Sequence, residues 1–276
     1  MSIILITGAS SGIGYDTAEM LARQGHTVYG AARRIEKIEE LRDAGVHPLQ
    51  MDVTDEESMR AGVKSVLDAE GRIDVLINNA GYGYFGAIET TPPEDARRQL
   101  EVNVFGLSML TALVLPGMRE RHSGRIINIA SVAGRVCMYF GGWYHVSKYA
   151  VEAFSDSLRI EMKPFGVEVV LIEPGGIHTN WGIIAADHLK KSSEGSAYEK
   201  EAANEAEIMH YAYSSDYLTD PSRVAKAICK AVNSKRPRVR YILGAGARTL
   251  LFLHAVLPSR WWDAMMRLGG RIKIRK

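Results

Sequence analysis

Short apolar runs alternate with amphipathic stretches along most of this 276-residue chain. The stretches between the runs, such as YDTAEMLARQ and IEKIEELRD, repeat their apolar residues at helical spacing. The runs have the length of β-strands and are rich in Val and Ile; they are SIILIT (2–7), HTVYGAA (26–32), DVLINNA (74–80), GRIINIA (124–130), VEVVLIEP (167–174) and RVRYIL (238–243). Strands of this kind are covered on both faces, so the order predicts an α/β fold with a doubly wound parallel sheet.

The composition predicts one large globular domain, or at most two. Hydrophobic residues make up 46% of the chain and charged residues 24%, and no repeat or linker divides it. The two cysteines, Cys137 and Cys229, are too few for a disulfide framework and lie at no metal-ligand spacing, so we expect a reducing compartment and no metal. The opening MSIILITGAS lacks the basic and apolar regions of a signal peptide, and the expected location is cytoplasmic.

Glycines at positions 8, 12 and 14 follow the first run, in TGASSGIG (7–14), and a helical pattern begins directly after them. Glycine lets the backbone turn tightly and approach a pyrophosphate, and the N-terminus of the helix offers its N–H groups to the negative charge. A glycine-rich turn between a first strand and a first helix therefore predicts a dinucleotide site. The residues expected to contact the cofactor here are Gly8, Ser10, Ser11, Gly12, Ile13 and Gly14.

With its GxxxGxG spacing, this turn resembles the TGxxxGIG motif of the short-chain dehydrogenase/reductase family. Further motifs agree with that family; they are NNAG (78–81), Asn103 in EVNVFG, Ser131 in NIASVAG, YHVSK (144–148) and EPGGIHT (173–179). The resemblance to the classical members covers about residues 1–235. It implies a single-domain Rossmann-type fold, an oxidoreductase that uses a nicotinamide cofactor, and a homo-oligomer, either a dimer or a tetramer.

Asn103, Ser131, Tyr144 and Lys148 match the catalytic tetrad of the family in identity and order. Tyr144 and Lys148 lie four residues apart, on one face of a helix. A free phenol has a pKa of about 10 and a nearby cation favours the phenolate, so Lys148 is expected to lower the pKa of Tyr144. Tyr144 would be the general acid for reducing a carbonyl and the general base for the reverse reaction, while Ser131 binds the substrate oxygen. The resemblance implies that Lys148 also binds the nicotinamide ribose and that Asn103 anchors a water.

The turn after the second run favours NADP(H) over NAD(H). A site for NAD(H) would hold an acidic residue there to bind the ribose 2′-hydroxyl, but this chain reads Ala32, Arg33 and Arg34. A guanidinium suits a doubly charged 2′-phosphate, so Arg33 and Arg34 are predicted to bind it.

The resemblance implies further cofactor contacts beyond the glycine-rich turn. Asp52 and Val53, in MDVTD (51–55), are expected near the adenine, and Asn78 braces the sheet. The remaining residues that it assigns to the cofactor, in addition to Tyr144 and Lys148, are Asn79, Ala80, Gly81, Pro174, Gly175, Ile177 and Thr179.

Ser131, Tyr144 and Trp181 are the expected substrate contacts. Apolar and aromatic residues in MYFGGW (138–143) border the same place, which suits a lipophilic ketone, aldehyde or alcohol such as a steroid or retinoid. Core packing or a subunit contact explains those residues equally well. Two alternatives remain open: a reductase of 3-oxoacyl thioesters, and an NADP(H) sensor that binds a partner without turnover.

Residues 1–244 are expected to form the dinucleotide-binding and catalytic domain. Within it, residues 182–218 are polar and form either a solvated excursion or a lid over the substrate pocket. Residues 245–276 form an apolar and basic extension, and residues 235–276 hold eleven Lys or Arg against one Asp. This extension either packs on the domain with a solvated basic end or lies on an anionic membrane surface. It carries no nucleic-acid recognition motif.

Overall fold

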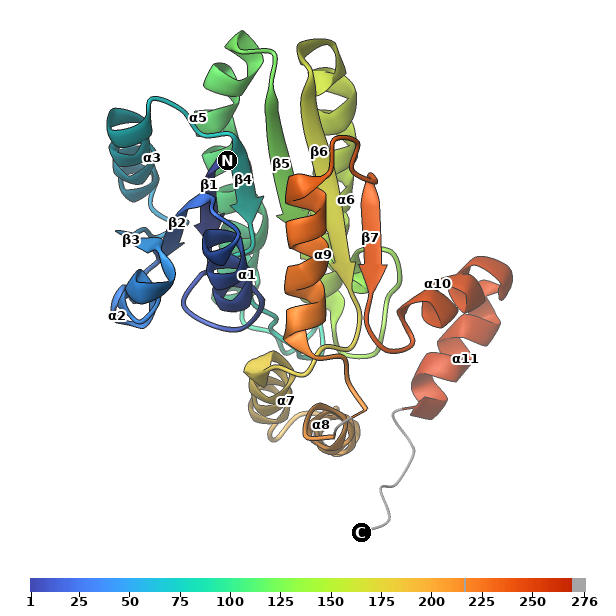
Figure 1. Ribbon diagram of the computed structural model, residues 1–276. Coiled ribbons are helices and arrows are strands. Elements are labelled where there is room, and N and C mark those ends of the chain that lie inside the picture. Colours follow the sequence, from blue (N-terminus) through green and yellow to red (C-terminus); the bar gives the residue numbers. More distant parts are fainter. Residues whose placement is uncertain (216, 270–276) are drawn as a thin grey trace.

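The computed structural model describes residues 1–215 and 217–269 of the chain. Its centre is one sheet of seven strands, all parallel, in the order β3-β2-β1-β4-β5-β6-β7 (Figure 1). The strands are β1 (Ile3–Thr7), β2 (Thr27–Ala32), β3 (Val46–Gln50), β4 (Val75–Asn78), β5 (Gly124–Ile129), β6 (Val167–Pro174) and β7 (Arg240–Leu243). The strand order reverses direction between β1 and β4, so the predicted doubly wound Rossmann-type sheet in a single domain is confirmed.

Helices surround this sheet on both faces and at the carboxyl ends of its strands (Figure 1). They are α1 (Gly12–Arg23), α2 (Glu36–Glu39), α3 (Glu56–Glu70), α4 (Pro93–Leu100), α5 (Leu107–Glu120), α6 (Gly142–Met162), α7 (Asn180–Ser192), α8 (Glu199–Tyr213), α9 (Pro221–Asn233), α10 (Ala247–Val256) and α11 (Ser259–Gly269). Successive residues of β1 point to opposite faces. Ile4 packs in a core with Leu21 of α1 and Ile228 of α9, whereas Leu5 packs in a second core with Leu110 of α5, and α3 and α6 lie on that second side (Figure 1).

The strand β3 is absent from the six runs that the sequence pattern predicts. Its residues VHPLQ include a histidine and a proline, which weaken a strand pattern. The structure accepts Pro48 because β3 is an edge strand. The N–H of Met51 donates to the carbonyl of Ala32 on β2, while the N–H of Val46 donates away from β2 to Leu41. Alternation along the strand therefore turns the nitrogen of Pro48 to the outer side, where β2 needs no donor.

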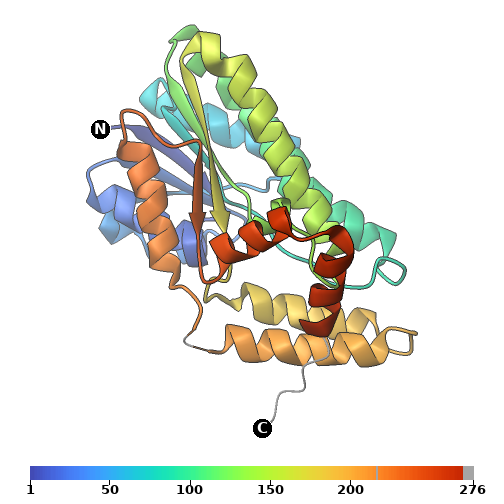
Figure 2. The ribbon, with the colours of Figure 1, turned by 90° about the vertical axis from the view of Figure 1, so that its right-hand side faces the viewer.

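The helices α7 and α8 lie across the carboxyl ends of the strands, and α10 and α11 lie beside them (Figure 2). Residues 182–218 are thus largely helical, and Asp216 lies outside the described residues. In the extension, α11 packs on the domain through Trp262, which is 5% exposed and whose Nε1–H donates to the carbonyl of Cys137 at 3.1 Å. The basic end at 270–276 lies outside the described residues.

One continuous helical stretch, Pro93–Glu120, is long and apolar enough to cross a membrane by length and composition alone. It consists of α4, the π-helical segment Glu101–Gly106 and α5. Leu110, Val114 and Met118 of α5 are buried in the second core of the sheet, so this stretch is a core helix of the fold.

Candidate active site

The glycine-rich turn after β1 is clamped by the NNAG motif after β4. Gly8 has φ +67°, and a Cβ there would lie 2.9 Å from the Cα of Ala80 and from Nδ2 of Asn79. A Cβ on Gly14 would lie 2.4 Å from the same Nδ2. The Asn79 amide donates to the carbonyls of Thr7 at 2.9 Å and Gly8 at 3.2 Å. Gly8 and Gly14 are therefore required by the turn itself, and Asn79 holds the turn in place.

Gly12 has the open surface that a phosphate needs. Its φ is +55°, and the nearest atom to an added Cβ is Cγ2 of Thr179 at 3.9 Å. Ser11 is exposed and extended at the N-cap of α1, and its side chain makes no capping hydrogen bond. The first N–H groups of α1 are thus available to an anion, and the predicted phosphate contact stays a prediction. Ile13 is half-buried and packs against the core on the α1 side of the sheet, so it supports the turn from below.

Arg33 and Arg34 follow β2 at the carboxyl edge of the sheet. Both side chains are exposed, and among the described residues neither guanidinium makes a hydrogen bond or an ion pair. The strand register places them between the turn after β1 and the loop after β3, where Asp52 lies. Two free guanidiniums beside a phosphate-binding turn fit a 2′-phosphate.

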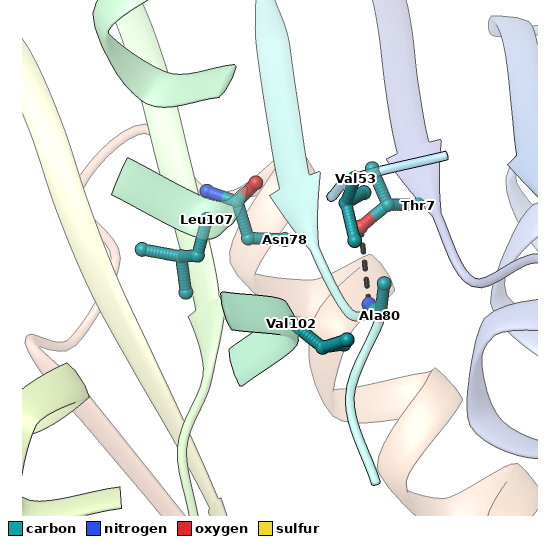
Figure 3. A pocket seen from close by; sticks show the side chains of 6 residues that line it. All are labelled: Thr7, Val53, Asn78, Ala80, Val102 and Leu107. Carbon is teal, nitrogen blue, oxygen red and sulfur yellow. Dashed lines mark hydrogen bonds between the residues drawn. The ribbon is translucent and has the colours of Figure 1, made fainter. Parts of the chain in front are cut away.

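A narrow pocket lies where the loop after β3 meets the NNAG motif (Figure 3). Its lining residues come from four separate segments; they are Thr7, Val53, Asn78, Ala80, Val102 and Leu107. The Thr7 hydroxyl accepts the N–H of Ala80 at 3.0 Å, which joins β1 to this motif. Asn78 donates to Thr111 and Asn128, so its role is structural, as predicted.

Asp52, which precedes this pocket, turns its carboxylate to the local backbone. Its Oδ1 accepts from the N–H and the hydroxyl of Thr54, at 2.9 and 2.8 Å. This turn positions Val53 at the pocket. The adenine contact predicted for Asp52 and Val53 stays a prediction.

Ser131, Tyr144 and Lys148 meet at the carboxyl end of β5. Ser131 ends the loop after β5, and its Oγ donates to the carbonyl of Pro174 at 3.1 Å. Tyr144 and Lys148 lie in the first two turns of α6, and all three residues are at most 8% exposed. Nζ of Lys148 donates to the carbonyl of Ile129 at 2.8 Å and lies 5.9 Å from the centroid of the Tyr144 ring. Since an ammonium has three hydrogens, it retains donors for a ribose.

Two residues that the sequence analysis left without a role hold this group together. Gly134 follows Ser131, and a Cβ there would lie 2.7 Å from the backbone carbonyl oxygen of Lys148, so only glycine lets the loop pack on α6. His145 is 2% exposed; its Nδ1 lies 3.0 Å from the carbonyl oxygen of Ala133 and its Nε2 accepts the N–H of Met138 at 2.9 Å. Burial lowers the pKa of His145, which keeps it neutral with its proton on Nδ1. Its place inside YHVSK is the only sequence signal for this role.

The expectation that Lys148 lowers the pKa of Tyr144 is wrong for the protein alone. Burial raises the pKa of Tyr144 well above its ordinary value of 10, and a hydrogen bond with Ser131 offsets only part of this. The ring is enclosed by apolar residues, while the Lys148 ammonium is turned to Ile129. Burial also lowers the pKa of Lys148 to about 8, which the charge of Glu152 opposes. At neutral pH Tyr144 therefore carries its proton, as a general acid must.

Asn103 lies in the π-helical segment rather than in regular α-helix. Its Oδ1 accepts the N–H of Tyr82 at 3.0 Å, and its Nδ2 donates to the carbonyl of Tyr82 and to the Ser147 hydroxyl. The amide thus ties the loop after β4 to α6, beside Gly81, whose added Cβ would lie 3.8 Å from Nζ of Lys148. The hydrogen bonds of the Asn103 side chain described here are all to protein groups. The water anchor predicted for Asn103 stays a prediction.

The EPGGIHT segment lines the other end of the cofactor site. Pro174 ends β6, and its carbonyl accepts the Ser131 hydroxyl. Thr179 faces the glycine-rich turn, since a Cβ added to Gly12 would lie 3.9 Å from Cγ2 of Thr179. The side chain of Ile177 is buried in the core at 5% exposure, so a cofactor could reach its backbone only. Gly175 lies close to α10, since a Cβ there would be 2.9 Å from Cβ of Ala247.

Trp181, at the start of α7, packs against Tyr144. The ring centroids of Trp181 and Tyr144 are 4.9 Å apart, and Phe85 lies 5.8 Å from each of them. Tyr213 of α8 lies 6.1 Å from Trp181. The rings of Phe85, Tyr144 and Trp181 belong to one apolar cluster with buried residues of α7 and α8 and with Met138, Tyr139 and Phe140. Phe85 and Tyr213 were not predicted, because their sequence context carries no motif.

A buried ion cluster lies behind the catalytic residues. Glu173, which precedes Pro174, is completely buried and pairs with Arg240 at 2.9 Å and with Arg135 at 3.2 Å. Arg240 also pairs with Glu152 of α6 at 3.0 Å. The pKa of Glu152 is raised to about 7, mainly by burial and secondly by repulsion from the Glu173 carboxylate. The positive charge of Arg240 offsets part of this rise. The cluster joins β6, β7 and α6, which no local sequence pattern indicates.

The comparisons with known proteins agree with this geometry. The family model described as short chain dehydrogenase matches residues 2–188. A probable short-chain type dehydrogenase/reductase of Helicobacter pylori is 39% identical over 96% of each chain, and a 3-ketodihydrosphingosine reductase of Bacteroides thetaiotaomicron is 37% identical over 98% of this chain and 97% of its own. The closed form of a serine dehydrogenase complexed with NADP⁺ has a TM-score of 0.76 and 28% identity, and the match covers 88% of this chain and 94% of its own. Because the family model, the curated relatives and the parallel sheet agree, the chain belongs to the short-chain dehydrogenase/reductase family of oxidoreductases.

Proposed function

We propose that the protein is an NADP(H)-dependent reductase that converts a ketone or aldehyde on a lipophilic substrate to an alcohol. The observation that carries this proposal is that Ser131, Tyr144 and Lys148 are buried together, with Tyr144 inside an apolar, aromatic cluster. The nicotinamide supplies the hydride when it is bound. The protein supplies the polar groups at the carbonyl oxygen and the apolar surroundings that exclude water.

Each catalytic residue has one task in this proposal. The Ser131 hydroxyl binds the carbonyl oxygen and stabilises the negative charge that develops on it. Tyr144 donates its proton to that oxygen, and the raised pKa of Tyr144 keeps the proton in place until the oxygen becomes basic. Lys148, largely protonated below its pKa of about 8, stabilises the resulting phenolate and holds the ribose. A neutral phenol at rest favours the reductive direction.

NADP(H) selectivity is proposed from Arg33 and Arg34. Both side chains are exposed next to the phosphate-binding turn, and no acidic residue occupies the end of β2. The relative solved with NADP⁺ supports this choice of cofactor.

A long-chain lipid ketone is the substrate class that the surroundings support best. The groups around Tyr144 are rings and aliphatic chains, including Phe85, Trp181 and Phe140. They suit an apolar chain and offer little to a charged substrate. The name of the 37% identical relative, a 3-ketodihydrosphingosine reductase, supports the same class. On this proposal α7 and α8 form the lid that was predicted for residues 182–218.

The test is NADPH consumption by the purified protein with a set of carbonyl compounds. The set contains 3-ketodihydrosphingosine, a steroid ketone, retinal and a 3-oxoacyl thioester, and Tyr144→Phe is the control. Turnover of the lipid ketone that is lost in Tyr144→Phe supports the proposal. Turnover of the thioester alone would assign the protein to the second candidate, a 3-oxoacyl thioester reductase. NADPH binding without turnover of any compound contradicts the proposal and favours a sensor.

The family commonly forms oligomers, and we propose a homodimer or homotetramer. Phe105 of the π-helical segment and Val146 and Tyr149 of α6 are large apolar residues that are 40–50% exposed on neighbouring helices. Light scattering of the purified protein tests this, because a monomer at all concentrations contradicts it.

A further inference from the structure

The helix α10 is apolar, yet it is scarcely buried. Its sequence ARTLLFLHAV contains five large apolar residues, but Ala247 is its only buried residue. Phe252 is 65% and Val256 is 56% exposed, and they lie four residues apart on one face. A helix of ten residues is about 15 Å long, half the thickness of the hydrocarbon core, so it cannot span a membrane.

The helix α11, which follows α10, also exposes large apolar side chains. Trp262 anchors it: the ring is buried, contacts His254 of α10 at 4.7 Å between centroids, and donates to Cys137. On another face of α11, Trp261 is 70% and Leu268 is 62% exposed, and these two residues lie seven positions apart. We call Phe252, Val256, Trp261 and Leu268 the α10–α11 surface. Four large apolar side chains exposed on two consecutive helices are more than scattered surface residues.

Positive charge surrounds the α10–α11 surface. Arg248, Arg260 and Arg267 are exposed on the same two helices, where Asp263 is the only acidic residue. The sequence that follows, RIKIRK, adds four basic residues and no acidic one. Tryptophan and leucine side chains flanked by Arg and Lys suit the interface of an anionic lipid bilayer.

A second copy of this chain is a weaker match for the same surface. A two-fold contact would press the patch against itself, so Arg260 and Arg267 would approach the arginines of the other copy. Like charges that face each other weaken such a contact, whereas anionic headgroups attract the same residues.

We propose that the α10–α11 surface docks the protein on an anionic membrane surface. The helices lie in the headgroup layer with Phe252, Val256, Trp261 and Leu268 towards the lipid chains. The anchor Trp262 binds Cys137, directly before Met138, a residue of the apolar cluster around Tyr144. The helices α10 and α11 therefore lie beside the carboxyl ends of the strands, where α7 and α8 cover the candidate active site (Figure 2).

Co-sedimentation with vesicles tests the proposal on the full chain. The vesicles contain phosphatidylcholine alone or phosphatidylcholine with phosphatidylglycerol, each at low and high salt. We expect binding to the anionic vesicles at low salt and release at high salt. The double variant Phe252→Glu/Trp261→Glu should lower the affinity by about tenfold or more, because two apolar contacts are replaced by charges that lipid phosphates repel.

The matched control is Ile160→Glu, which adds the same type of charge at a 68% exposed residue near the end of α6. It should bind vesicles like the wild type. Retained NADPH binding shows that each variant is folded. No binding of the wild-type chain to anionic vesicles overturns the proposal, and so does binding that the double variant retains. A double variant that changes the oligomer mass in light scattering, without altering vesicle binding, would assign the surface to self-association and also overturn the proposal.

Vesicle binding requires no turnover. The result is therefore independent of which carbonyl compound the enzyme reduces.

Discussion

The Arg240 side chain on β7 and the fully buried Glu173 carboxylate on β6 form an ion pair, with Nε and Oε1 2.9 Å apart. The residue after Glu173 is Pro174, whose carbonyl accepts the Ser131 hydroxyl. A buried charge pair is thus one residue away from the group that orients a catalytic side chain. Its removal is expected to affect both stability and activity.

Arg240→Met is predicted to destabilise the protein by about 3 kcal/mol or more, since it leaves Glu152 without its partner and Glu173 with Arg135 alone. The measurement is urea unfolding followed by circular dichroism. Arg60→Met is the matched control, because Arg60 pairs only with Glu56 at the surface and should cost less than about 1 kcal/mol. An equal decrease in the free energy of unfolding of the two variants would show that the buried ion pairs contribute no more to stability than a surface pair.

Tyr144→Phe is predicted to lower kcat by a factor of about 10² to 10⁴ because it removes the proton donor. The phenyl ring keeps its packing against Trp181 and Phe85, so folding and NADPH affinity should be retained. Steady-state turnover and the fluorescence of bound NADPH measure the two effects separately. Turnover near the wild-type rate would refute the assignment of Tyr144.

Arg33→Asp is predicted to shift the preference from NADPH towards NADH. The carboxylate repels a 2′-phosphate and can accept a hydrogen bond from a 2′-hydroxyl. The measurement is kcat/KM with NADPH divided by kcat/KM with NADH, and this ratio should fall by about tenfold or more. Arg236→Asp makes the same charge change at an exposed residue at the opposite end of the sheet and should leave the ratio unchanged. An unaltered ratio in Arg33→Asp would mean that another group reads the phosphate.

The buried ammonium of Lys148 predicts a pH dependence of stability. Its pKa is about 8 in the folded protein and 10.5 ordinarily, so between these values the unfolded chain binds the proton and the folded chain releases it. Stability contributed by this group therefore rises with pH across that window. The free energy of unfolding of the wild type, relative to Lys148→Met, should increase by up to about 3 kcal/mol from pH 8 to 10.5. A constant difference would show that the pKa of Lys148 is not lowered.

The sheet and the catalytic group were predictable because the residues responsible for them are adjacent in sequence. Gly8, Gly12 and Gly14 form one short turn, and Tyr144 and Lys148 share one helix face. The apolar runs identify six strands without any knowledge of pairing. The seventh strand, β3, was not predicted because Pro48 interrupts the apolar pattern. A proline is compatible with this strand only because β3 lies at the edge of the sheet.

The pKa shifts and buried ion pairs of the site could not be predicted from the sequence. The pKa of Tyr144 depends on how Phe85 and Trp181 enclose the ring, and these residues come from distant parts of the chain. The pair of Glu173 and Arg240 likewise forms only when β7 adds to the sheet. Spacing along the sequence predicted that Tyr144 and Lys148 are close, but it carried no information on what surrounds them.

Pro48 also determines what β3 can do at the border of the sheet. An edge strand offers unpaired backbone groups on which a strand of another molecule can grow, and this is a common route to aggregation. The nitrogen of Pro48 faces that outer side and has no hydrogen to donate, so a regular ladder cannot continue across it. Pro48, which interrupts the strand pattern in the sequence, thereby disfavours edge-to-edge association of the protein at high concentration.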